Sequence, residues 1–193
     1  MRHQLFDLAR PFVYLAGVVT LVAGLWSQAK LSAARQPSEA ALRAVFSQDD
    51  AALARALSHG ADANATGPDG TAPLHGAAFR GKVNAMRLLL GHGADVDRRD
   101  GGRSTALHLA AMAGHVEAVD ELLTQRVDIN VRDDSGRTPL YLAAMGGHTA
   151  VVRSLLAHHA DPRIAAADGS RPLDAARADH HADAVVLLAA ANG

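Results

Sequence analysis

The chain has 193 residues, 49% of them hydrophobic and 20% charged, and its formal net charge is −1. This balance is that of an ordinary globular domain. It contains no cysteine, which excludes disulfides, thiolate catalysis and zinc sites with sulfur ligands. The basic excess is confined to residues 1–38, so residues 39–193 are mildly acidic. A mildly acidic region lacks the basic stripe that nucleic-acid binding requires, and we expect no nucleic-acid partner.

The first predicted element is an uncharged apolar stretch, residues 11–26, which follows two arginines. A basic start before an apolar centre is typical of a targeting segment. Ser27 and Ala29 offer a cleavage site, which would make residues 1–29 a signal peptide. An uncleaved signal anchor with Trp26 at the membrane interface is an equal alternative. A third interpretation is a buried helix that packs against the first part of the folded region that follows.

Either targeting segment predicts that the remainder of the chain is exported. Arginine outnumbers lysine 17 to 2 and alanine is abundant, which favours a GC-rich bacterial genome. We therefore expect the periplasm, or the periplasmic side of the inner membrane, with membrane contact only through an uncleaved N-terminal segment. Residues 30–38 read as a polar linker that follows it.

Beyond the linker the sequence repeats with a period of 33 residues. One leucine recurs in four motifs: Ala72-Pro73-Leu74-His75, Thr105-Ala106-Leu107-His108, Thr138-Pro139-Leu140-Tyr141 and Arg171-Pro172-Leu173-Asp174. Each motif is followed by a pair of alanines, and the first three by a glycine as well. This pattern resembles the ankyrin repeat, whose period and T-P-L-H-x-A signature it shares.

The resemblance implies an all-α fold, an ankyrin-repeat solenoid of stacked helix-turn-helix units with β-hairpin-like loops, here preceded by the N-terminal hydrophobic helix. The ankyrin repeat domain spans residues 39–193. Three good units are expected between two degenerate terminal ones: 39–65, 66–98, 99–131, 132–164 and 165–193. A polar cap is expected at the C-terminal end, where apolar or small residues are replaced by Arg171, Asp174, Asp179, His180 and His181.

The loops between units need glycine where the backbone adopts a positive φ. Gly70, Gly136 and Gly169 supply it. In the remaining loop Arg103 stands at that position, so we expect Gly101-Gly102 to relocate the turn.

The 11 histidines fall mostly on repeat positions. The resemblance implies that His75 and His108 form hydrogen bonds within and between repeats. The pairs His158-His159 and His180-His181 lack the i, i+4 spacing of a metal pair. The sequence also lacks a nucleophile elbow and a phosphate loop, so we expect no enzyme, no metal and no cofactor. A metal-binding or hydrolytic protein that depends on His158 and His159 is kept as a third hypothesis.

Large apolar residues stand two positions before the glycine that separates the two helices of a unit. They are Phe79, Met112 and Met145. In ankyrin-like stacks this position lies on the concave face, where the three side chains would form a stripe. We interpret the stripe as a protein-binding surface with Arg80 as a polar anchor. Partial burial against the adjacent helices is the alternative.

The loop tips form the second candidate surface, although such residues are solvated turns by default. Arginine at the two central tips favours an acidic rim on the partner. The candidate tip residues are Arg99, Arg103, Arg132, Asp134 and Arg137.

The functional prediction is a monomeric, non-enzymatic scaffold that binds a partner protein through the concave face and hairpin tips. The alternative function is a dedicated inhibitor or protective subunit of one cell-envelope enzyme.

Overall fold

The structure, a computed structural model, describes residues 41, 43–45, 47 and 49–192. The predicted targeting segment, residues 1–29, and the linker, residues 30–38, lie outside this part of the chain. Across the described residues the elements are helices, turns and loops, without a strand. Residues 41, 43–45 and 47 are helical. The helices that follow are α2 (Asp50–Ser58), α3 (Pro73–Phe79), α4 (Val83–Gly91), α5 (Ala106–Ala113), α6 (Val116–Leu123), α7 (Pro139–Met145), α8 (Thr149–Ala157), α9 (Pro172–Ala178) and α10 (Ala182–Ala191).

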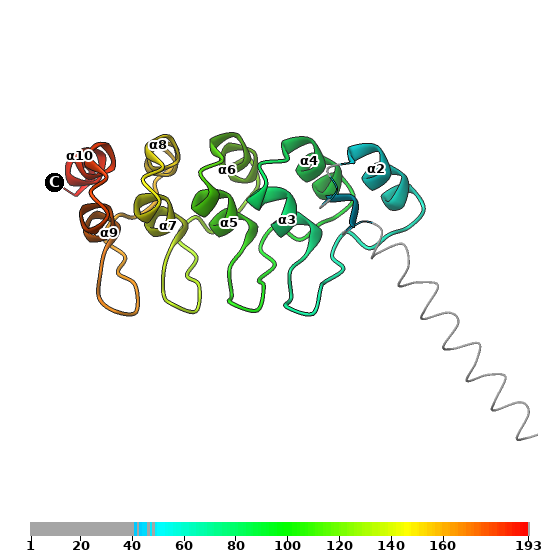
Figure 1. The fold of residues 1–193 in the computed structure, drawn as a ribbon, viewed down its shortest axis with the longest axis horizontal. Coiled ribbons are helices and arrows are strands. Elements are labelled where there is room, and N and C mark those ends of the chain that lie inside the picture. The colour runs from blue at the N-terminus through cyan, green and yellow to red at the C-terminus, as the bar shows by residue number, and fades with distance from the viewer. Residues whose placement is uncertain (1–40, 42, 46, 48, 193) are drawn as a thin grey trace, which may run out of the picture.

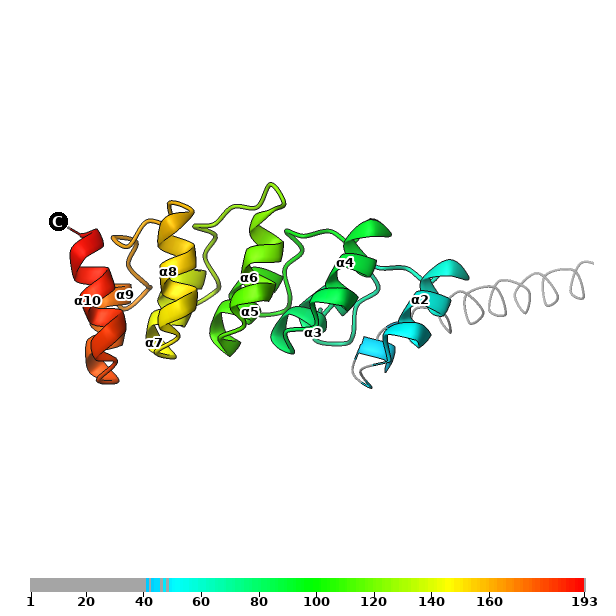
Figure 2. The same cartoon turned by 90° about the horizontal axis from the view of Figure 1, so that it is seen from above.

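The helices lie in two parallel rows, which confirms the predicted all-helical stack (Figure 1). First helices α3, α5, α7 and α9 form one row, and second helices α2, α4, α6, α8 and α10 form the other. The loop before each first helix projects away from the second-helix row. Seen from above, the second helices lie side by side in chain order (Figure 2). Among the described residues, none belongs to a helix long and apolar enough to cross a membrane.

Alanine pairs on the first helices set the spacing of the stack. Both alanines are fully covered in α3, α5 and α7: Ala77, Ala78, Ala110, Ala111, Ala143 and Ala144. A methyl group is small enough to let the neighbouring first helix approach closely, and α3, α5, α7 and α9 contact one another in that order. The sequence uses proline at the start of α3, α7 and α9, where the missing N–H has no helical partner.

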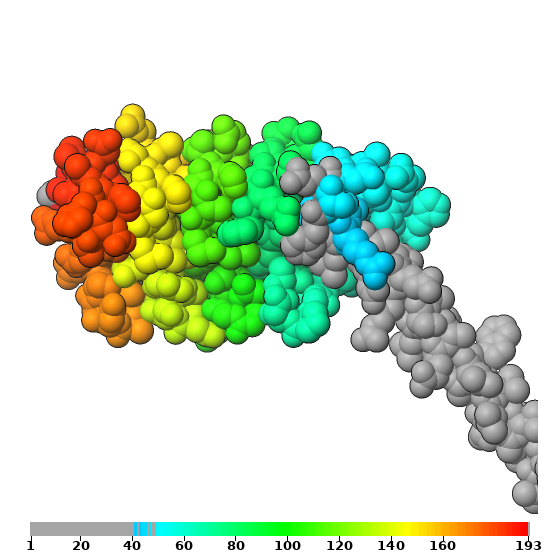
Figure 3. Space-filling view, in the orientation of Figure 1, coloured from blue at the N-terminus to red at the C-terminus, as the bar shows by residue number. Residues whose placement is uncertain are grey.

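The second helices supply the larger core side chains. Fully buried residues recur at helical spacing and join into one continuous cluster: Leu53, Met86, Leu89, Val119, Leu122, Val152, Leu155 and Leu188. Their spacing of about 3.6 residues is that of helix faces buried against neighbouring helices. Successive repeats appear as adjacent slabs in the space-filling view (Figure 3). Each repeat thus buries its apolar face against its neighbours, as in other repeat proteins.

The expected polar cap at the C-terminal end is only partly present. Asp174 and Asp179 are exposed on and just after α9. Helix α10, in contrast, exposes Val186, which is 68% accessible. Val186 occupies the repeat position at which earlier second helices carry Arg87, Asp120 and Arg153, so this part of the end is apolar where a charged residue is usual in the array.

Candidate functional site

The beginning of each first helix is fastened to the next repeat by the motif side chain. Nδ1 of His75 accepts the Ala72 N–H at 3.1 Å, which places the ring proton on Nε2. Nε2 then donates to the Arg98 and Ser104 carbonyls at 3.0 and 3.1 Å. The predicted bonding of this histidine within and between repeats is confirmed.

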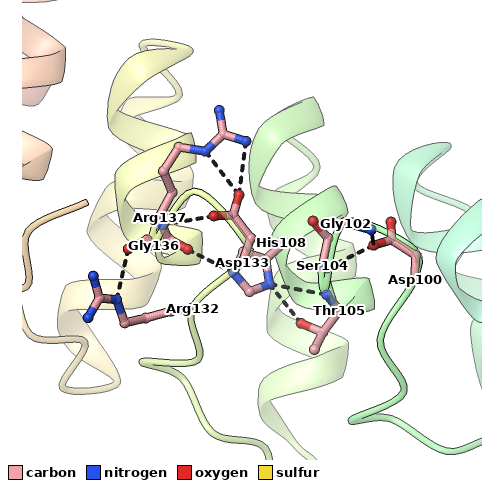
Figure 4. Close-up of polar contacts among 9 residues, drawn as sticks. All are labelled: Asp100, Gly102, Ser104, Thr105, His108, Arg132, Asp133, Gly136 and Arg137. Carbon is pink, nitrogen blue, oxygen red and sulfur yellow. Dashed lines mark hydrogen bonds and ion pairs between the residues drawn. The ribbon is translucent and has the colours of Figure 1, made fainter. Parts of the chain in front are cut away.

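His108 repeats the arrangement one unit later (Figure 4). Its Nδ1 accepts from the Thr105 N–H at 3.2 Å and from the Thr105 hydroxyl at 3.0 Å. Its Nε2 donates to the Arg137 carbonyl at 3.1 Å. In the unit of residues 132–164 the Tyr141 hydroxyl takes over this link and hydrogen-bonds the Ser170 hydroxyl at 2.9 Å. We call His75, His108 and Tyr141 the latch residues.

The latch histidines are neutral structural groups and do not serve as exposed bases. Burial lowers the pKa of both His75 and His108 below that of a solvated histidine, and hydrogen bonds to the next loop only partly offset this effect. A second ring proton would sit on Nδ1, directly facing backbone N–H donors. Both ring nitrogens are therefore committed to the stack, which leaves neither histidine available for catalysis.

Aspartates shape the two central loops (Figure 4). Oδ1 of Asp100 accepts the Gly102 and Ser104 N–H groups at 2.9 and 2.8 Å. The buried Asp133 accepts the Arg137 N–H at 2.8 Å and pairs with its guanidinium at 2.9 Å. Aspartate side chains commonly close turns by such bonds to nearby backbone groups. Sequence reasoning placed Arg137 at a binding tip, whereas the structure shows it bracing its own loop.

Neighbouring loops are joined by a hydrogen bond at each step. The donors are Gly101, Asp134 and Ala167, which bond the Asp69, Gly102 and Ser135 carbonyls at 2.8, 3.0 and 2.8 Å. The loops therefore form one connected surface beside the first helices.

In the two outer loops a hydroxyl hydrogen bond lowers the pKa of an exposed aspartate. Thr71 lowers the pKa of Asp69, and Ser170 lowers the pKa of Asp168.

The tip residues differ in how many bonds their side chains make within the array. Arg132 is the most committed, since Nε donates to the Gly136 carbonyl at 3.0 Å and Nη2 to the Ala165 carbonyl of the next loop at 2.9 Å. Arg99 donates one bond, from Nη1 to the Arg132 carbonyl at 3.3 Å. The pair Arg103–Asp134 is longer, 3.8 Å, and both side chains are exposed. Arg99, Arg103 and Asp134 are thus the predicted tip residues best placed to meet a partner.

The expected relocation of the turn near Gly101-Gly102 is wrong. Arg103 itself adopts the left-handed conformation with φ 59°, at the position where Gly70, Gly136 and Gly169 have φ 79°, 71° and 83°. The hydrogen bonds that Asp100 makes to Gly102 and Ser104 hold the loop in the shared shape. A non-glycine residue there carries backbone strain of about 1 kcal/mol, which this network offsets.

The end of each first helix carries the predicted apolar stripe. Phe79 and Met112 are 49% and 38% exposed, the values expected of an open surface. Met145 is partly buried, because it packs against a cluster formed by Tyr141, Leu142, Ala166 and Ala175. Both interpretations of the stripe thus apply, each to a different part: Phe79 and Met112 are open and Met145 is partly covered.

Histidines of the next repeat support the backbone under this stripe, a contact that sequence reasoning missed. His148 donates from Nε2 to the Met112 carbonyl, and His181 to the Met145 carbonyl, each at 3.0 Å. His148 also lies against Gly114, where an added Cβ would come within 2.5 Å of its ring. The signal was present as a recurring glycine and a histidine 34 residues later.

The remaining histidines do not form a chemical centre in the part of the chain that the structure describes. No group of three or more His, Asp or Glu side chains there is placed to hold a metal ion. His92 and His158 are exposed and bond carbonyls of their own helices at 2.8 and 2.9 Å. These bonds terminate helices and give no support to the metal or hydrolytic hypothesis.

The architecture is that of an all-helical repeat protein. A family description, Ankyrin repeats (3 copies), matches residues 41–133 and 119–193, and the chain belongs to the ankyrin repeat family. Ankyrin repeats are generally protein–protein interaction modules, and the family is typically a non-enzymatic binding scaffold. A search of curated proteins found no match to the chain.

Proposed function

We propose that the array binds one partner protein through the exposed ends of its first helices, with the central loop tips as a polar rim. The observation that carries this proposal is the exposure of Phe79 and Met112 at the same position of adjacent repeats. Apolar side chains that lie open beside one another on a soluble surface mark interaction sites. Aromatic residues are enriched among the side chains that dominate binding energy.

Polar groups around the stripe define its rim. Arg99 and Arg103 are exposed on the loop that precedes α5, and Arg80 is exposed directly after Phe79. An arginine at the edge of an apolar contact favours an acidic residue on the partner and speeds association. The prediction for Arg132 and Arg137 is weaker, because both are bonded within the loops.

Quantitative affinity purification tests the proposal. The wild-type chain is compared with the double variant Phe79→Glu/Met112→Glu, and Val186→Glu serves as the matched control because Val186 is also an exposed large apolar residue. We expect one abundant partner to be lost from the double variant and retained by the control. An unchanged set of partners would show that Phe79 and Met112 do not form the binding site.

The stoichiometry of the recovered complex then separates two roles. A tight one-to-one complex that changes an enzyme's activity would support the inhibitor or protective subunit. A partner bound without any change in enzyme activity, or several partners of modest affinity, would support the scaffold, which is the role proposed here.

The location proposed for the array is the bacterial cell envelope, with the repeats on the periplasmic side. Support comes from the sequence of residues 11–26, an apolar stretch behind a basic start. Mass spectrometry of the protein recovered from envelope fractions tests this proposal. A mature chain that begins near residue 30 would establish a cleaved signal, and an intact chain in the membrane fraction would establish an anchor. Recovery of the intact chain in the cytoplasmic fraction would contradict export.

A further inference from the structure

The end of each first helix and the turn after it form a segment of four residues that recurs along the array. The segments are 79–82, 112–115, 145–148 and 178–181, and we call them together the turn row. They follow one another along one edge of the stack, because α3 contacts α5, α5 contacts α7, and α7 contacts α9. The stripe residues are the first members of the first three segments.

Charge changes from one end of the turn row to the other. The first segment contains Arg80 and Lys82, the second and third contain no Asp, Glu, Lys or Arg, and the fourth contains Asp179. Arg80 and Asp179 occupy the same position of their repeats, and both are exposed. Arg177 and Asp183, exposed on either side of Asp179, offset one another and leave this end acidic. The row is therefore basic, then apolar and uncharged, then acidic.

The backbone of the turn row is held in place before any partner arrives. Histidines of the following repeat donate to the Met112 and Met145 carbonyls, and the glycines of the first three turns have positive φ. His180 replaces the glycine in the fourth turn and keeps the same conformation with φ 60°. A surface fixed in this way loses little conformational entropy when it binds.

The dimensions of the row suit an extended peptide. Packed helices lie about 10 Å apart, and an extended chain advances about 3.3 Å per residue, so about three peptide residues span one repeat. Arg80 and Asp179 are separated by three repeats, which corresponds to about 30 Å, or about nine residues of extended chain.

We propose that the turn row binds an extended segment of the partner in one charge order. An acidic residue of the segment lies against Arg80 and Lys82, apolar residues cover Phe79 and Met112, and a basic residue about nine positions away lies against Asp179. This inference rests on the proposed function, because it uses the same surface. It adds the chemistry and the orientation of the ligand.

A displayed library of random 12-residue peptides, panned against the full chain in detergent, supplies the probe. A synthetic, labelled copy of the tightest peptide is then measured by fluorescence anisotropy. We expect it to carry acidic and basic residues about nine positions apart around an apolar centre. Arg80→Glu cancels the charge of Lys82 and Asp179→Lys reverses the charge of the acidic end, so each should weaken its binding by about five- to tenfold. The matched control is Arg153→Glu on the outer helix α8, which should change affinity less than about twofold.

The decisive experiment reverses the charges on the protein and on the peptide together. A peptide with its acidic and basic residues interchanged should bind the triple variant Arg80→Glu/Lys82→Glu/Asp179→Lys within about threefold of the original pairing. Failure of this rescue, while Phe79→Ser still abolishes binding, would overturn the charge order and leave the proposed function intact. If panning yields no peptide whose binding depends on Phe79, the proposed function and this inference both fail.

Discussion

The two ends of each first helix perform different tasks. At the N-terminal end His75 and His108 are buried and bonded to the next loop. At the C-terminal end, in the same helices, Phe79 and Met112 lie open. One turn of helix therefore separates a group that holds the stack together from a group available to a partner. Changes at the first end should act on stability, and changes at the second on binding.

The largest effect is expected from His108→Ala. The substitution leaves a cavity and removes the partner of the buried Thr105 N–H and that of the partly buried Arg137 carbonyl. We expect the free energy of unfolding to fall by about 3 kcal/mol, measured by urea denaturation. His92→Ala, at an exposed helix end, is the control and should cost less than about 0.5 kcal/mol. Equal effects in the two variants would show that the buried hydrogen bonds of His108 do not stabilise the stack.

A pair of glycines isolates the contact beneath the stripe. Gly114 and Gly93 have φ 77° and 81°, but an added Cβ meets His148 only at Gly114 and has no neighbour within 4 Å at Gly93. Gly93→Ala should cost about 1 kcal/mol through backbone strain. Gly114→Ala should cost about 2–3 kcal/mol, because the histidine ring must also move. Thermal or urea unfolding of both variants gives the comparison, and equal losses would show that the His148 contact is unimportant.

Acid should weaken the latch before it protonates the carboxylates. Because burial lowers the pKa of His75 and His108, their contribution to stability is complete above about pH 6.5 and declines as the pH falls below it. Urea midpoints between pH 7.5 and 5 should therefore decrease, with a shallower decrease in His75→Gln/His108→Gln. An identical pH dependence in the double variant would assign the effect to other groups. Hydrogen bonds to Thr71 and Ser170 lower the pKa of Asp69 and Asp168, so the contribution of these carboxylates to stability is retained over this pH range and is lost only as the pH falls further.

The smallest effects on stability are expected at the stripe, and they should be graded. Phe79→Ser and Met112→Ser should change the free energy of unfolding by less than about 0.5 kcal/mol, since both side chains are largely exposed. Met145→Ser should cost about 1 kcal/mol, because Met145 packs against Tyr141 and Leu142. Melting temperatures of the three variants test the order. A loss at Phe79 that exceeds the loss at Met145 would contradict it.

Properties repeated in every unit could be predicted from the sequence. The 33-residue period and the resemblance to the ankyrin repeat anticipated the helices and their order. The histidine of the T-P-L-H motif anticipated the bond to the next repeat. Each of these features depends on residues that recur at the same position of successive repeats.

Properties that depend on one particular neighbour could not be predicted. Met145 is covered because its own unit has Tyr141 in place of the motif histidine. Arg132 is committed because the carbonyl of Ala165 lies within reach in the next loop. Arg103 adopts a positive φ because Asp100 holds the loop around it. In each case the deciding contact joins residues whose distance in space is set only once the repeats are stacked.

Hydrogen–deuterium exchange of the full chain, free and bound to its recovered partner, tests the division of the first helices most directly. We expect binding to slow exchange in peptides that cover residues 79–82 and 112–115. Peptides that cover α4, α6 and α8 should exchange as in the free protein. Added protection confined to α4, α6 and α8, with residues 79–82 and 112–115 unchanged, would contradict it.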